Sequence, residues 1–84
     1  MKEPLHIGNI IREKLEEEGR AASWLAKKIN CDRTNIYKIF NRQDINTEQL
    51  LKISEALHYD FFAHYSEFIR EKADSVQEGD ILSI

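Results

Sequence analysis

The chain has 84 residues, a length that suits one small domain and leaves no room for a second. A hydrophobic fraction of 42% is enough for a core, and 12 basic against 15 acidic residues is too balanced for compositional disorder. The single cysteine excludes an internal disulfide and a zinc-ribbon ligand set, which fits a reducing cytosol. No apolar run approaches the roughly 20 residues that span a bilayer, and no secretory signal follows Met1. We therefore expect a cytoplasmic protein with no membrane partner.

The first amphipathic stretch predicts a helix over residues 6–18. Apolar side chains from Ile7 to Leu15 recur at i, i+3, i+4 and i+8, which is the spacing of one helix face. Gly19 follows, and a glycine at this position readily adopts the left-handed conformation that ends many helices. We expect the helix to stop there.

Two shorter helices are predicted over residues 22–29 and 32–41, joined by a tight turn. The earlier one has only about two turns, so it needs tertiary contacts to be stable. Asn30 suits the turn because asparagine tolerates a positive φ angle better than other non-glycine residues. Asp32 can cap the later helix, since its carboxylate can accept a hydrogen bond from a backbone amide of the first turn. The apolar set that would lock the two helices together is Leu25, Ala26, Ile29, Cys31, Ile36 and Ile39.

Two more helices are predicted after this pair. Asn46 and Gln49 have the spacing of a capping box ahead of an apolar stripe that runs from Leu50 to Leu57. Asp60 is a candidate cap for the fifth helix. The apolar face of that helix consists of Phe61, Phe62, Tyr65, Phe68 and Ile69. These five side chains could close the core over the first and fourth helices, or some could contact a second subunit.

The last segment, residues 73–84, loses helical periodicity from Asp74 onward. It is either a flexible tail or a short strand that pairs with the edge of a partner. The chain is accordingly divided into a helical domain, residues 1–72, and this tail. Five short helices with short connections indicate an all-α domain.

The overall charge of −3 and the pI of 5.6 conceal an uneven distribution. Residues 1–20 have a net charge of −1, residues 21–46 a net charge of +3, and residues 47–84 a net charge of −5. The positive charge therefore lies on the two short helices, where a phosphate backbone could contact it. A low pI for the whole chain does not exclude binding to nucleic acid.

The sequence LAKKINCDRTNIYKIFN, from Leu25 to Asn41, resembles the helix-turn-helix of the lambda-repressor-like, or Cro-type, DNA-binding family. LLKISEAL at residues 50–57 is similar to the fourth helix of that family, and the resemblance covers roughly residues 6–70. It implies a five-helix lambda-repressor-like domain with the helix-turn-helix at the second and third helices. Asn30 stands where the family often has glycine, and the stretch after Phe68 has no counterpart.

A further departure concerns the start of the second helix. Many family members have a threonine-glutamine pair that caps this helix and buttresses a phosphate contact. Ala21 and Ala22 occupy those positions in this chain, so the buttress is absent. At the start of the second helix, only Ser23 or backbone amides could contact the phosphate in place of this pair.

The resemblance also implies that residues 32–41 form a recognition helix in the major groove. An arginine such as Arg33 suits a bidentate contact with guanine, and Asn35 could read adenine. The candidate base-reading residues are Arg33, Thr34, Asn35 and Tyr37. The candidate phosphate-binding residues are Ser23, Lys27, Lys38, Asn41 and Arg42. Alternatively, Arg33 and Lys38 form a solvated helix face, and Tyr37 packs over the fourth helix.

Other chemically distinctive residues have structural interpretations. Trp24 is expected to pack beside its helix, and Cys31 to be a buried, inert thiol. His6, His58 and His64 form no metal-like cluster with the cysteine, so surface or capping roles are expected. The sequence predicts neither a metal site nor a cofactor.

The function expected from these features is that of a sequence-specific transcriptional regulator, a repressor that binds double-stranded DNA as a homodimer. The alternative is an antitoxin-like or adaptor module whose acidic C-terminal third binds a protein partner, with DNA binding secondary. An enzyme is not expected, because the chain has no nucleophile elbow, phosphate-binding glycine loop or zinc motif. A bacterial or phage origin, with a nucleoid location when bound to DNA, fits the resemblance.

Overall fold

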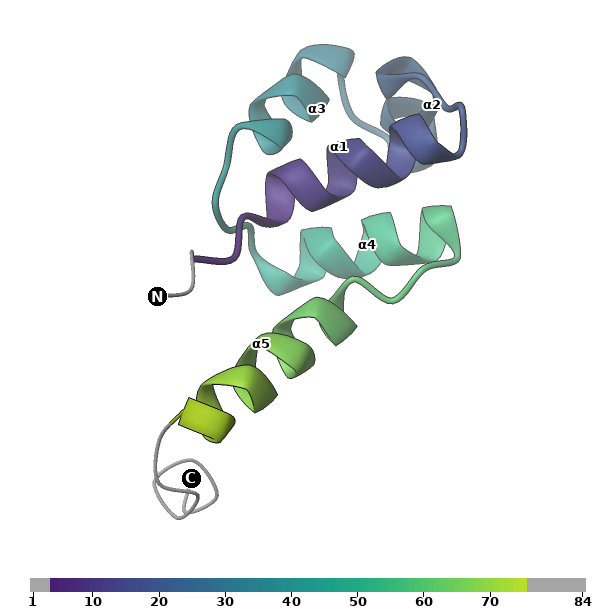
Figure 1. Cartoon of the computed structure of the whole chain (residues 1–84). Helices are drawn as coiled ribbons and strands as arrows, with labels where there is room; N and C mark the ends of the chain where they lie inside the picture. The colour runs from purple at the N-terminus through teal and green to yellow at the C-terminus, as the bar shows by residue number, and fades with distance from the viewer. Residues whose placement is uncertain (1–3, 76–84) are drawn as a thin grey trace.

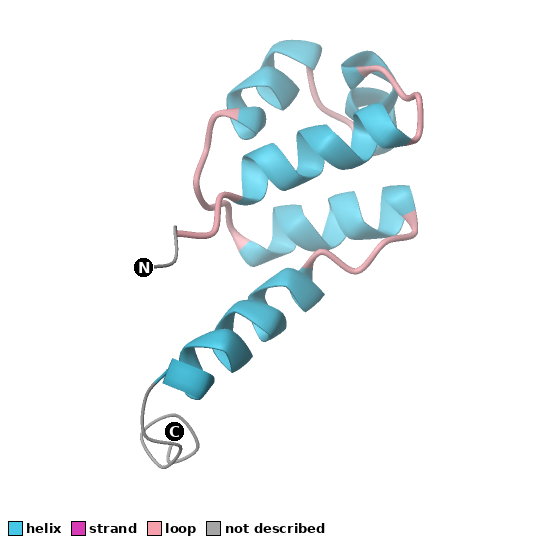
Figure 2. Cartoon of the chain, in the orientation of Figure 1, coloured by secondary structure: helices cyan, strands magenta, loops and turns pink. Residues whose placement is uncertain are grey.

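The computed structural model describes residues 4–75, and over this range the chain is helical with no strand (Figures 1 and 2). The helices in chain order are α1 (Ile7–Glu17), α2 (Ala22–Lys28), α3 (Arg33–Phe40), α4 (Thr47–Leu57) and α5 (Phe62–Ser75). The predicted all-α class is confirmed. The strand or tail predicted for the end of the chain falls mainly on residues 76–84, outside the described residues.

Local signals set both ends of α1. Nδ1 of His6 accepts a hydrogen bond from the backbone amide of Asn9 at 3.1 Å, so this histidine has the capping role expected for it. Beyond the other end, Gly19 adopts a φ of +68°, as predicted. The helix therefore lies within the predicted range of residues 6–18.

The turn between α2 and α3 has the predicted backbone conformation but not the predicted cap. Asn30 adopts a φ of 59°, and the amide of Cys31 donates to the carbonyl of Ala26 at 2.8 Å. Asp32 occupies the N-cap position of α3, but its carboxylate makes no capping hydrogen bond. Its backbone carbonyl accepts from the amide of Asn35 at 3.0 Å instead. The predicted carboxylate cap is therefore wrong: Asp32 contributes its backbone carbonyl to the first turn of α3, and its side chain makes no capping bond.

The beginnings of α4 and α5 differ in how well the sequence predicts them. Oδ1 of Asn46 accepts from the amide of Gln49 at 2.7 Å, which confirms the predicted cap. Asp60, by contrast, does not directly precede α5, which begins at Phe62; its backbone carbonyl accepts from the amide of Ala63 at 3.3 Å. At its other end α5 continues to Ser75, so the helical part passes the predicted boundary at residue 72.

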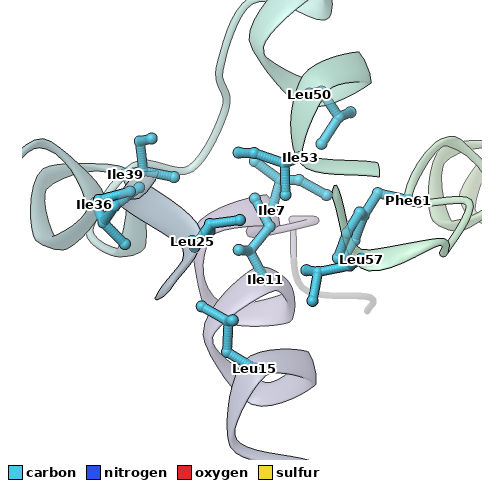
Figure 3. Close-up of a cluster of buried hydrophobic side chains, with 11 residues drawn as sticks. Ile7, Ile11, Leu15, Leu25, Ile36, Ile39, Leu50, Ile53, Leu57 and Phe61 are labelled. Carbon is cyan, nitrogen blue, oxygen red and sulfur yellow. The ribbon is translucent and has the colours of Figure 1, made fainter. Parts of the chain in front are cut away.

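The core is built from apolar side chains of the first four helices together with Phe61 (Figure 3). Residues of the predicted stripes meet there, and no polar or charged side chain is buried with them in the described part of the chain. The buried residues are Ile7, Ile11, Leu15, Leu25, Ala26, Ile36, Ile39, Leu50, Ile53, Leu57 and Phe61. Ile29 and Cys31 are only half-buried at its edge. The prediction of a buried Cys31 thiol is therefore wrong, because the residue lies in the turn and its Sγ contacts the carbonyl of Asp32 at 3.6 Å.

The start of α1 lies directly against the end of α3, and the contact requires glycine. The amides of Ile7 and Gly8 donate to the carbonyls of Gln43 and Arg42, each at 3.0 Å. A Cβ on Gly8 would lie 2.5 Å from the carbonyl oxygen of Phe40 and 2.6 Å from that of Arg42. The backbone of α1 thus holds the end of α3 in place. Sequence reasoning did not single out this glycine.

A cluster around Tyr59 anchors the beginning of α5. The Tyr59 hydroxyl lies 2.7 Å from Nε2 of His64, and its ring meets that of Phe61 edge-on with centroids 4.7 Å apart. Nζ of Lys14, on α1, lies 4.4 Å from the centroid of the Tyr59 ring. These contacts fix the first turn of α5 to α1.

Beyond this anchor α5 leads away from the other four helices (Figure 1). Of the five apolar residues predicted for its inner face, Phe61 is buried and precedes the helix, and Ile69 is 53% exposed. Phe62, Tyr65 and Phe68 are half-buried. Phe61, Phe62 and Tyr65 therefore help to close the core, whereas the apolar face of α5 continues beyond the core to the exposed Ile69. No helix among the described residues is long and apolar enough to cross a membrane.

Candidate nucleic-acid interface

One side of α3 forms an exposed polar surface. Arg33, Thr34, Tyr37 and Lys38 are exposed, whereas Ile36 and Ile39 point into the core. This division follows from the helical period, because the buried residues hold one face and leave the opposite face to solvent. Among the described residues neither Arg33 nor Lys38 makes an ion pair, so both cations are available to a ligand.

The remaining base-reading candidate, Asn35, has a different environment. Its side chain is half-buried at the edge of the exposed face. A shallow pocket of about 410 Å³ brings it together with Thr34 and Lys38 beside the turn at residues 30–32. Asp32 lines the same pocket, so its carboxylate would oppose an anion there.

The predicted phosphate-binding residues lie on three elements. Ser23 and Lys27 are exposed on α2, and Lys38 is exposed on α3. Asn41 is the C-cap of α3, and the exposed Arg42 follows it. Nε of Arg42 donates to the backbone carbonyl of Asp44 at 3.2 Å, which restricts the orientation of the guanidinium group.

Tyr37 lies at the centre of the exposed side of α3. Its side chain is 52% exposed, and its ring meets that of Phe40 edge-on with centroids 5.8 Å apart. Tyr37 lines a pocket together with residues of α1 and the start of α2, and no residue of α4 lines that pocket. The alternative that placed Tyr37 over the fourth helix is therefore wrong, because α1 and not α4 borders this side of α3.

A concave site, which we call the α1–α3 pocket, adjoins this face. It has a volume of about 390 Å³ and is formed where α1, the loop before α2, and the end of α3 meet. Its lining residues are Arg12, Leu15, Glu16, Arg20, Ala22, Tyr37, Phe40 and Asn41. Tyr37 and Asn41 were candidates from the sequence. Arg12 and Arg20 were not, and the only signal that could have found them is their charge.

The indole of Trp24 positions one of these arginines. The guanidinium carbon of Arg20 lies 4.4 Å from the centroid of the Trp24 ring, and Nζ of Lys28 lies 5.6 Å from it. Trp24 itself is half-buried and packs against the core, as predicted. A stacked guanidinium loses little further freedom when it binds an anion.

The other reactive side chains are not gathered into a site. Among the described side chains, those of residues 4–71, no group of three His, Cys, Asp or Glu could hold a metal ion. Two groups outside α3, Lys14 and Tyr65, have displaced pKa values. The hydrogen bond to Glu17 raises the pKa of Lys14, and burial, followed by the charge of Asp44, raises the pKa of Tyr65.

Comparisons of the chain with models of protein families, with curated proteins and with solved structures gave no match.

Proposed function

We propose that the protein is a sequence-specific transcriptional regulator, a repressor, in which α2 and α3 form a lambda-repressor-like helix-turn-helix that binds double-stranded DNA. The observation that carries the proposal is the exposed side of α3, where Arg33, Thr34, Tyr37 and Lys38 lie together on a helix anchored to the core. The net charge of +3 over residues 21–46 adds the electrostatic attraction that a phosphate backbone requires. No catalysis or cofactor is assigned to the chain.

In this mechanism α3 lies in the major groove, which is wide enough to admit one helix. Arg33, in the first turn, donates two hydrogen bonds to a guanine, and Thr34, Asn35 and Tyr37 contact neighbouring base edges. The phosphate contacts come from Ser23, Lys27, Lys38, Asn41 and Arg42. Base contacts select the sequence, whereas phosphate contacts fix the position of the helix on the duplex.

Two copies of the chain would bind two half-sites about one helical turn apart. The exposed continuation of the apolar face of α5 supports such a homodimer, because Ile69 is 53% exposed. Occupation of a promoter by the dimer would repress transcription in a bacterial or phage-infected cytoplasm.

Selection from a random duplex library with excess nonspecific competitor tests the proposal. We expect enrichment of a palindromic motif whose affinity falls steeply as the salt concentration rises. Arg33→Ala is expected to cost about 1–3 kcal/mol of binding free energy and to relax the preference at one base pair. Arg42→Ala should weaken binding to all sequences equally, and Arg70→Ala, on α5, provides a matched control.

Two results would contradict this function. An equal loss on every sequence for Arg33→Ala would refute its base-reading role. Absence of any enriched motif for the wild-type chain would remove sequence-specific DNA binding altogether.

A second candidate is an antitoxin-like or adaptor module that binds a protein partner. The observation that favours it is the combination of an exposed apolar residue on α5 with the net charge of −5 over residues 47–84. Copurification of a basic protein, lost in the Ile69→Glu variant and kept in the Arg33→Ala variant, would support it.

A further inference from the structure

We propose that the α1–α3 pocket holds one phosphate group of the DNA backbone between the guanidinium groups of Arg12 and Arg20. The inference rests on the proposed function, and it adds Arg12, Arg20 and the pocket between them as a further phosphate-binding site. The sequence pattern gave neither arginine a role. The two lie on separate elements, α1 and the loop before α2, and become neighbours of one concavity only in the folded chain.

The groups that line the pocket match the chemistry of a phosphate. Each guanidinium presents a planar set of N–H donors that suits two phosphate oxygens at once. Asn41, already assigned a phosphate contact, lines the same pocket, and its side-chain amide can donate a further hydrogen bond. Among the described residues, Arg12 and Arg20 make no ion pair, so neither charge is already neutralised.

The position of the pocket selects the DNA backbone as the source of the phosphate. Tyr37 belongs both to the exposed side of α3 and to the pocket, so the two surfaces are continuous. A duplex whose major groove receives α3 must bring a sugar-phosphate strand past the border of that helix. At this border the N-cap of α2 is Ala21, which makes no side-chain capping bond, and Ala22 contributes only a methyl group to the pocket. Arg12 and Arg20 thus supply donors at a border where the side chains of Ala21 and Ala22 have none.

Glu16 allows a test in which the loss of a charge should strengthen DNA binding instead of weakening it. Glu16 lines the same pocket, and within the described chain its carboxylate makes no ion pair with either arginine. The carboxylate would therefore repel a phosphate in the pocket rather than serve as the partner of Arg12 or Arg20. Removal of its charge should strengthen DNA binding, whereas removal of either arginine should weaken it.

The experiment measures duplex affinity against salt concentration for Arg12→Gln, Arg20→Gln and Glu16→Gln. All three residues are exposed, so the variants should keep the fold, which thermal unfolding verifies. Each arginine variant should lose about tenfold in affinity on specific and scrambled duplexes alike. Loss of the phosphate contact should lower the slope of log affinity against log salt by about one. Arg70→Gln and Glu67→Gln, on α5, make the same charge changes at exposed positions outside the pocket.

A phosphate-by-phosphate substitution separates a direct contact from general attraction. Each phosphate of the selected duplex is replaced in turn by an uncharged methylphosphonate. At one position per half-site, the neutral linkage should abolish the difference between wild type and Arg20→Gln, and that result supports the proposal. It is overturned if no position does so, or if the Arg12, Arg20 and Glu16 variants behave like their α5 controls.

Inorganic pyrophosphate, titrated without DNA and monitored through arginine side-chain NMR signals, distinguishes failure of the pocket from failure of the function. Duplex binding that is unaffected by the pocket variants overturns the pocket and leaves the proposed function standing. Shifts of the Arg12 and Arg20 signals by pyrophosphate, with no duplex bound by wild type, overturn the DNA source and the proposed function together. If the chain binds neither pyrophosphate nor duplex, both the pocket proposal and the proposed function are overturned.

Discussion

The two amphipathic helices α3 and α5 differ in how they are held, and this difference matters more than their length. α3 has eight residues, yet its end is fixed by the start of α1 at Gly8, and Ile36 and Ile39 hold its inner face in the core. α5 has 14 residues, but only its first half packs against the core among the described side chains, through Phe62 and Tyr65, and its apolar face continues to the exposed Ile69. A short helix can thus be placed more firmly than a long one.

The two helices also expose opposite chemistry. The exposed side of α3 is polar and basic, whereas the outer part of α5 exposes the apolar Ile69 beside the charged Glu67 and Arg70. A firmly placed polar face suits recognition of base edges, because each donor must arrive at a fixed position. An exposed apolar side chain outside the core, such as Ile69, suits a protein partner, including a second copy of the chain.

The largest expected change in stability follows from the burial of the inner face of α3. Ile36→Ala should cost about 2–5 kcal/mol of unfolding free energy, because it removes buried methyl groups and leaves a cavity. Ile69→Ala should change the unfolding free energy of the monomer by about 0.5 kcal/mol or less. Chemical denaturation of both variants at low protein concentration measures the difference. Equal losses would refute the contrast between α3 and α5.

The second prediction concerns the contact between α1 and α3. Gly8→Ala should destabilise the fold by about 3 kcal/mol, because the new Cβ meets three backbone carbonyl oxygens that cannot rotate away. The thermal unfolding midpoint should fall by about 10 °C or more.

Gly19→Ala serves as the control for that substitution. A Cβ on Gly19 would meet nothing within 4 Å, so only its positive φ of +68° is disfavoured. The expected cost is about 1 kcal/mol, since one non-glycine residue must adopt the left-handed region. If the two glycine variants lose the same stability, close contact does not explain the placement of α3.

The third prediction sharpens the role of α5. If its outer face joins two copies of the chain, Ile69→Glu should weaken self-association by about tenfold or more, because a charge would be buried in the interface. Sedimentation equilibrium measures the association, and circular dichroism verifies that the variant is folded. Self-association equal to that of wild type would place the interface elsewhere.

The smallest effect concerns alkaline pH. Burial and the charge of Asp44 raise the pKa of Tyr65 above its ordinary value of 10.0, and the hydrogen bond to Glu17 raises that of Lys14 above 10.5. In both cases the native state holds its proton more tightly than the unfolded state, so stability is complete below about pH 10 and falls as pH rises further. Tyr65→Phe should reduce this alkaline loss of stability. Denaturation curves between neutral and alkaline pH would contradict the assignment if the variant lost stability as steeply as wild type.

Much of the local structure could be predicted because its signals are local. The cap at Asn46, the left-handed residues Asn30 and Gly19, and the apolar stripes act within a few residues of themselves. The orientation of the α3 side chains followed from the same helical period. The failures at Asp32 and Asp60 were also local: one is a side-chain capping bond that does not form, and the other is a helix that begins later than predicted, at Phe62.

The sequence by itself determined the helices, most of the core and the polar side of α3. Only the tertiary structure decided that Gly8 lies against the carbonyls of α3 and that Arg12, Arg20 and Tyr37 border one pocket. The physical reason is separation along the chain. Helical periodicity connects residues three or four positions apart, whereas these contacts join residues on different helices and depend on how close-packed side chains orient those helices.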